Sequence, residues 1–239
     1  MANFSLEISA AVSTAWEYAK KYGLLIAVIY LLVGVVSGGL QSMVSPSFSV
    51  GDQQAITEAI GRGDWEGIGK MAQAYNTSIG SNISTMLGGL ISTIVSVGLY
   101  NLALGLMGGR FTEVTFEAFK LPFATYLKVF VVSFIVGIIG IAAFFCCVIP
   151  FFFVAPRLIL APVYQVENPE AGIGDSISAA WKMTSDNTMS MLGLGIIMVG
   201  IGILGFLCCC IGVYFAEAIQ LFALIAAYNQ LKGNLQLNQ

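Results

Sequence analysis

The stretch that decides the fold runs from Pro150 to Lys182 and reads PFFFVAPRLILAPVYQVENPEAGIGDSISAAWK. It joins an apolar run long enough to cross a bilayer to a short polar connection and then to a segment ending in Ala-Ala-Trp-Lys. A single arginine, Arg157, interrupts the apolar run. Because much of this order of features recurs elsewhere in the chain, the stretch predicts both a membrane fold and an internal repeat.

The composition of the whole chain is typical of integral membrane proteins. Of its 239 residues, 57% are hydrophobic and only 10% are charged, and the mean hydropathy is +0.86. Soluble globular domains usually carry about 25% charged residues. The formal net charge is −3 and no basic cluster exists, which argues against nucleic acid as a partner. Charged residues within the first 21 positions argue against a cleavable signal, so we expect the N-terminus to be retained.

Three segments have the 3.6-residue periodicity of amphipathic helices, and they span residues 5–21, 110–120 and 172–184. In each segment apolar side chains gather on one face and charged side chains on the other. We predict that these helices lie in the membrane interface, with Asp175 as the N-cap of the third. The aromatic residues that we expect to anchor them are Trp16, Phe119 and Trp181.

The lengths of the apolar runs predict six membrane crossings. Residues 23–44 and 83–107 each suffice for one crossing of a roughly 30 Å hydrocarbon layer. Residues 129–166 and 189–231 contain one charged residue each, and as single helices each would be roughly 57 Å long or longer, so each must turn back. We expect the turns at 147–150 and 210–212.

The polar stretch 45–82 separates the first two crossings. Its helix-forming pieces, around Gln53 to Ile60 and Trp65 to Tyr75, are interrupted by Gly61 and Gly63. We therefore predict two short helices on a membrane surface.

An offset of 62 residues superposes Ala118-Phe119-Lys120 on Ala180-Trp181-Lys182 and Cys146-Cys147 on Cys208-Cys209. Ala15-Trp16 supplies a third copy once the polar insertion is allowed for. The predicted fold is thus an all-α integral membrane protein, a single domain over 1–239, with six transmembrane helices in three repeats of interfacial helix plus hairpin. The repeats span residues 1–107 with the insertion 45–82, then 108–168, then 169–239. Chance alignment of apolar runs is the alternative.

The distribution of cations predicts the orientation. With the N-terminus inside, seven lysines and arginines fall on the cytoplasmic side and two in the outer loop. This predicts that both termini are cytoplasmic.

The run Arg157-Leu-Ile-Leu-Ala-Pro-Val-Tyr, its acidic connection Glu167-Asn-Pro-Glu170, and Asp175-Ser-Ile-Ser-Ala-Ala-Trp-Lys resemble the hallmark region of bacterial YciC-like six-helix inner-membrane proteins. The membrane domain accompanying some glycerophosphoryl diester phosphodiesterases is similar. Ser178 stands here where that group has an acidic residue. The resemblance covers most of the chain and implies the six-helix fold and a location in the bacterial inner membrane; most of that group has no established activity.

Two charged residues fall inside predicted crossings, and both lie six or seven residues past an outer turn. A charge in hydrocarbon is costly unless it is paired or faces water, so we predict that Arg157 and Glu217 pair or share a hydrated cleft with Gln220. The alternative is that each side chain reaches toward the outer headgroups.

Five cysteines lie just before the proposed outer turns: Cys146, Cys147, Cys208, Cys209 and Cys210. Packing, a disulfide between hairpins and a soft-metal site are the alternatives, in that order. The chain has no histidine, and the cysteine spacing fits no zinc pattern.

Three function classes follow from these features. We favour a non-catalytic membrane scaffold or accessory subunit that acts through its cytoplasmic amphipathic helices, with the lipid bilayer and a membrane-protein partner or second copy as contacts and no cofactor. The alternative is a transporter or channel with a polar cleft at Arg157 and Glu217, which also needs inner polar groups such as Tyr100 and Asn101. An intramembrane enzyme is the weakest, because no acid/base or metal motif is present.

Overall fold

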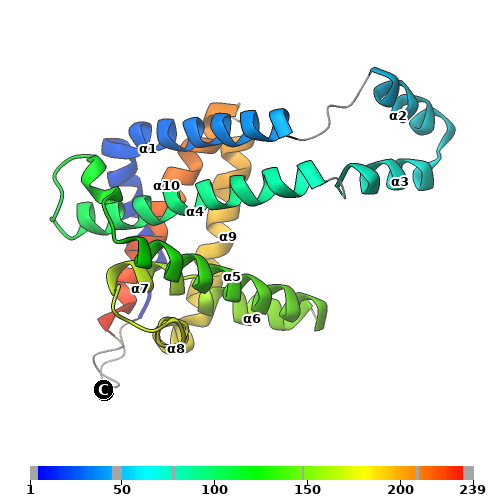
Figure 1. Cartoon of the computed structure of the whole chain (residues 1–239). Coiled ribbons are helices and arrows are strands. Elements are labelled where there is room, and N and C mark those ends of the chain that lie inside the picture. The colour runs from blue at the N-terminus through cyan, green and yellow to red at the C-terminus, as the bar shows by residue number, and fades with distance from the viewer. Residues whose placement is uncertain (1–4, 45–49, 77–78, 147, 208–209, 234–239) are drawn as a thin grey trace. The chain divides into compact units, whose positions relative to one another are not determined.

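The computed structural model describes residues 5–44, 50–76, 79–146, 148–207 and 210–233, and side chains within those ranges except near their ends at the turns and in the polar stretch. The fold is 87% helical, with no strand among the described residues (Figure 1). Five helical segments are long and apolar enough to cross a membrane, which is compatible with a multi-pass membrane protein. They span Ile8–Gly39, Leu87–Met107, Phe123–Phe145, Ile173–Leu207 and Gly212–Leu231.

The chain divides into two compact units. One unit comprises residues 32–93 and contains the end of α1 (Ile8–Val44), the polar stretch and the first half of α4 (Ile79–Met107). The predicted pair of short helices is confirmed there as α2 (Val50–Arg62) and α3 (Trp65–Asn76). The break falls at Gly63, whose φ of +68° disfavours other residues, whereas Gly61 stays helical.

The other unit begins with the first half of α1, where the predicted helix 5–21 forms but differs from the prediction in its length. The helix does not end before Gly23 but continues as one element of 37 residues. Its N-terminal half also packs antiparallel along α10 (Cys210–Leu231), because Glu7 N donates to Gln230 Oε1 and the Trp16 ring meets Phe215 edge-on. A stripe of small residues at i, i+4 spacing permits this close approach, and its members Ala11, Ala15 and Ala19 are fully buried.

The predicted helix at residues 110–120 is also wrong. Only a single 3₁₀ turn, Phe116–Phe119, forms there. Two phenylalanine rings instead dock against glycines of α4, where an added Cβ would lie 2.0 Å and 2.1 Å from ring atoms. Tertiary packing of these rings therefore overrides the helical period of the sequence. The docked pairs are Phe119 on Gly98 and Phe111 on Gly105.

Both predicted hairpins are present. Helix α5 (Phe123–Cys146) packs against α6 (Val148–Leu158). Helix α9 (Thr188–Leu207) packs against α10, and Figure 1 shows these two helices side by side. Residues 147 and 208–209, which connect the helices of each pair, lie outside the described part of the chain.

The predicted fourth crossing does not form one continuous helix. After α6 the backbone makes a turn at residues 159–160 and resumes as α7 (Ala161–Glu167), with Pro162 in its first turn. A proline at this place lacks the N–H that a continuous helix needs and clashes with the preceding turn. The count of six crossings is therefore not confirmed, and the threefold repeat stays a prediction.

The third amphipathic segment is confirmed as helix α8 (Ile173–Thr184). Asp175 is not its N-cap, since Gly172 holds that position and Asp175 lies three residues further on. The Asp175 carboxylate accepts a hydrogen bond from Gly172 N at 3.2 Å, which is the acidic half of a capping box. A 3₁₀ turn, η2 (Ser185–Asn187), then leads from α8 into α9.

Candidate functional site

Arg157 joins three helices. Its Nε donates to the Thr188 hydroxyl at 2.9 Å, which links the end of α6 to the start of α9. Its guanidinium carbon lies 4.6 Å from the centroid of the Trp181 ring on α8, a cation–π contact. The Arg157 carbonyl accepts a hydrogen bond from the Thr184 hydroxyl at 3.1 Å. Arg157, which the sequence singled out by its charge, therefore connects the end of α6 to both α8 and α9.

The expected ion pair between Arg157 and Glu217 is not formed. The three ion pairs among the described residues lie elsewhere, at Arg62–Glu58, Lys70–Glu66 and Lys232–Glu167. The Arg157 guanidinium is instead held by its hydrogen bond to Thr188 and its cation–π contact with Trp181. Gln220, the third member of the expected cleft, donates its side-chain amide to the Met198 carbonyl at 2.9 Å and so ties α10 to α9.

Glu217 lies in a different environment. Its side chain is half-buried on α10, and Tyr30 of α1 and Tyr100 of α4 lie near it. Asn101, a second inner polar group considered in the sequence, is buried and donates to the Ala118 carbonyl at 2.8 Å. That amide therefore has a structural partner.

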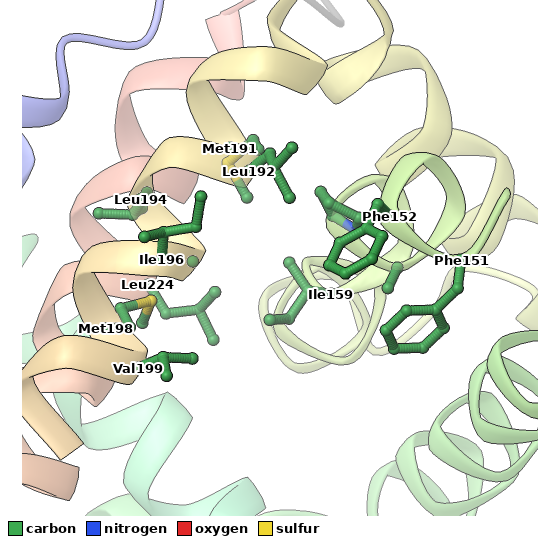
Figure 2. Close-up of a pocket in the computed structure, with 13 residues that line it drawn as sticks. Phe151, Phe152, Ile159, Met191, Leu192, Leu194, Ile196, Met198, Val199 and Leu224 are labelled. Atoms are coloured by element: carbon green, nitrogen blue, oxygen red, sulfur yellow. The ribbon is translucent and has the colours of Figure 1, made fainter. Parts of the chain in front are cut away.

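An apolar cavity lies between α6 and α9 (Figure 2). Its volume is about 410 Å³, within the range of small-molecule sites. In Figure 2, Phe152 of α6 and Ile159 of the following turn face Leu192 and Ile196 of α9 across the cavity. Arg157 and Thr188 do not line the cavity, since Arg157 lies on the other side of α6 from Phe152, Ala155 and Pro156. The remaining lining residues are Phe151, Met191, Leu194, Gly195, Met198, Val199 and Leu224.

The three predicted anchors have different surroundings. Trp181 is 40% exposed on α8, next to the exposed Lys182. Trp16 is 48% exposed and helps to line a second apolar cavity of about 400 Å³ between α1, α9 and α10. Phe119 is half-buried against Gly98, and the neighbouring Phe116 is the exposed ring, at 87%. Trp16 and Trp181 are therefore the more exposed of the three, and their role as anchors stays a prediction.

The prediction for the five cysteines concerns side chains outside the described part of the chain. Among the residues searched, no three metal-ligating side chains come together.

The sequence reading missed the polar contacts that hold α7 and α8 in place. Gln165 is fully buried in α7, where its Oε1 accepts from the Ser176 hydroxyl at 2.8 Å and its Nε2 donates to the Ala171 carbonyl at 3.2 Å. Lys128 donates to the Pro169 carbonyl at 2.6 Å. The sequence could have indicated these contacts, because Gln165, Ser176 and Lys128 lie inside or beside apolar segments and buried polar groups need hydrogen-bond partners.

Comparison with protein-family models, with curated proteins and with solved structures finds no match for this chain. The resemblance to YciC-like proteins therefore remains a prediction from the sequence.

Proposed function

We propose that the chain is a non-catalytic multi-pass membrane protein that acts as a scaffold or accessory subunit through helix α8. The observation that carries this proposal is the contrast between the two sides of α8. One side is buried against the α5–α7 region, whereas Trp181 and Lys182 on the other side are exposed. The buried side consists of Ser176, Ala179, Ala180, Met183 and Thr184.

An exposed tryptophan beside a lysine is the combination that holds a helix at the boundary between headgroups and acyl chains. The stacking of Trp181 on Arg157 fixes the ring relative to α6, which supports a rigid contact surface. The proposed contacts are the lipid bilayer and a membrane-protein partner or a second copy. The proposed location is the bacterial inner membrane with both termini cytoplasmic, because the cations favour that side.

Depth-dependent fluorescence quenching tests this placement of α8. The protein with Trp16→Phe and Trp65→Phe keeps Trp181 as its sole tryptophan and is reconstituted in vesicles of phospholipids brominated at different depths. We expect bromines nearest the headgroup to quench Trp181 most. The matched control is Ile197→Trp in a background lacking all three tryptophans, since Ile197 is exposed near the middle of α9 and should be quenched by deep bromines. Identical depth profiles for the two proteins would contradict the proposal.

The second candidate is a transporter or channel, and the position of Glu217 is the observation that favours it. A carboxyl in an apolar helix, with Tyr30 and Tyr100 nearby, is the type of group that marks a proton or ion pathway. Proteoliposomes loaded with a pH-sensitive dye would measure the flux, and Glu217→Gln should abolish it. Equal flux in empty vesicles would reject this candidate.

A further inference from the structure

We propose that the Arg157 guanidinium, on the α8 side of α6, binds the headgroup phosphate of an anionic phospholipid. The inference deepens the proposed function and rests on it, because the guanidinium meets headgroups only if α8 lies at the membrane boundary. Three observations support it: the guanidinium has a fixed position, its two terminal nitrogens are free, and no acidic side chain pairs with it. The apolar cavity between α6 and α9 has no part in the proposed site.

Two contacts fix the position of the guanidinium. Its Nε donates to the Thr188 hydroxyl at 2.9 Å, and its central carbon lies 4.6 Å from the centroid of the Trp181 ring. The Thr188 hydroxyl in turn donates to the Thr184 carbonyl at 3.1 Å, so its oxygen remains available to accept from Arg157. A group that is ordered before a ligand arrives loses less conformational entropy when the ligand binds.

The two terminal nitrogens of Arg157 are available to a ligand. Arginine has five N–H donors in a planar fork, and Nε provides only one of them. Within the part of the chain that the structure describes, the terminal nitrogens form no hydrogen bond. The only buried side-chain nitrogen or oxygen without a partner there is the Ser37 hydroxyl oxygen, so both nitrogens reach the surface. Phosphate oxygens match the geometry of this fork.

No acidic side chain among the described residues neutralises Arg157. The three ion pairs found there involve other residues. The charged residues on either side of Thr184, Lys182 and Asp186, have opposite signs, so Arg157 leaves this junction with a net positive charge. A cation in an apolar segment is costly unless it is paired or hydrated. An anion from outside the chain would provide the missing partner.

The surroundings of Arg157 favour a lipid headgroup as that anion. Trp181, which stacks on the guanidinium, is partly exposed, and the adjacent Lys182 is exposed as well. Tryptophan and lysine on an interfacial helix lie among the headgroups. Anionic phospholipids present a phosphate with net negative charge at that depth, whereas the choline cation of phosphatidylcholine offsets its own phosphate.

Native mass spectrometry of the delipidated protein in detergent tests the proposal. The probes are dioleoyl-phosphatidylglycerol and dioleoyl-phosphatidylcholine, which share acyl chains and differ in headgroup charge. We expect one phosphatidylglycerol to bind about tenfold more tightly than phosphatidylcholine, as one charge-assisted contact allows. Excess inorganic phosphate should not displace it, because free phosphate has no apolar chains to hold it at the membrane boundary. Displacement by inorganic phosphate would overturn the assignment of the site to a lipid.

Two substitutions that each remove one positive charge separate a specific site from general attraction to anionic lipid. Arg157→Gln should abolish the preference for phosphatidylglycerol while leaving phosphatidylcholine binding unchanged. The matched control is Lys182→Gln, which removes an exposed cation next to Trp181 and should keep the preference. Equal losses in the two proteins would show that only the total charge matters and would overturn the proposal.

Arg157→Lys decides the matter if Arg157→Gln fails to fold, because it retains the charge. Lysine presents a compact ammonium in place of the planar fork, so the preference should fall to about threefold. An unchanged preference would contradict the proposal. Quenching of Trp181 reports independently where α8 lies. Interfacial quenching without lipid selectivity would therefore refute the lipid site alone, and selective binding with quenching by deep bromines would refute the placement of α8 alone.

Discussion

The second arms of the two hairpins stand 62 residues apart in the sequence and differ in continuity. Helix α10 runs unbroken for 22 residues, about 33 Å, whereas its counterpart is divided into α6 with 11 residues and α7 with 7. Pro156 and Pro162 in the broken arm correspond to Ala218 and Leu224 in the continuous one. Pro156 lies inside α6 without interrupting it, whereas Pro162 directly follows the turn that separates α6 from α7. A similar apolar content therefore does not ensure one continuous helix, since a single proline can end it.

The break has a structural consequence. In the broken arm, Arg157 lies at the end of α6, where it contacts Thr188 and Trp181. The second piece of this arm, α7, packs against α8. The continuous arm instead holds Gln220 against the α9 backbone. One arm therefore builds a polar junction beside a cavity, and the other builds a closely packed hairpin.

A proline in the continuous arm should give the largest effect. Leu224→Pro removes a helical hydrogen bond and clashes with the preceding turn, so it should lower the free energy of unfolding by about 3 kcal/mol or more beyond the loss in Leu224→Ala. Pro162→Leu is the matched change in the broken arm and should cost little, because Pro162 lies in the first turn of α7. Thermal unfolding in detergent measures all three. Equal stability of Leu224→Pro and Leu224→Ala would show that α10 does not need its continuity.

Side-chain volume at the hairpin contact should give the next largest effect. An added Cβ at Gly205 of α9 would lie 2.7 Å from both the Gly212 carbonyl and the Ala216 methyl. The corresponding residue of α5 is Ala143, so the other hairpin already accommodates a Cβ. Gly205→Leu should therefore destabilise the protein by about 1–3 kcal/mol. Gly200→Leu, with no atom within 4 Å of the added Cβ, should not, and a similar loss in both would refute the close contact.

The buried amide of the broken arm provides the third comparison. Gln165 corresponds to Ala227 of α10, so only the broken arm carries this polar group. Ser176→Ala removes the donor to Gln165 Oε1 and should cost about 1–3 kcal/mol, because a buried acceptor loses its partner. Ser178→Ala, on the exposed side of the same helix, should change stability by less than about 0.5 kcal/mol. The same unfolding assay would contradict this account if the two variants were equally stable.

Local sequence signals predicted the hairpins, the two helices of the polar stretch and α8. The turns were readable because an apolar run longer than a bilayer must reverse, and Gly63 marked the break between α2 and α3. Asp175 was correctly associated with the start of α8 but misplaced by three positions, because either end of a capping box resembles an N-cap.

The contacts between distant segments were not predictable in the same way. The amphipathic period of residues 5–21 predicted a helix but not its contact with α10, which includes the packing of Trp16 on Phe215. Arg157 was singled out correctly, but its partners were not, since a charge in an apolar run shows only that some partner is needed. Thr188 and Trp181 lie 31 and 24 residues away, and one sequence gives no measure of such proximity.

The smallest expected effect lies where the two arms end together. The Glu167 carboxylate at the end of α7 accepts a hydrogen bond from the Tyr228 hydroxyl of α10 and pairs with Lys232 at 3.1 Å. Because both charged side chains are partly exposed, Lys232→Ala should cost no more than about 1 kcal/mol, and the loss should shrink as salt is raised. Tyr228→Phe removes the hydrogen bond from the buried Tyr228 to the Glu167 carboxylate. It should lower the free energy of unfolding by as much or more, with little dependence on salt. Unfolding at low and high ionic strength distinguishes them, and a salt-independent loss in Lys232→Ala would mean that the lysine stabilises the junction by packing along Tyr228 and not by its charge.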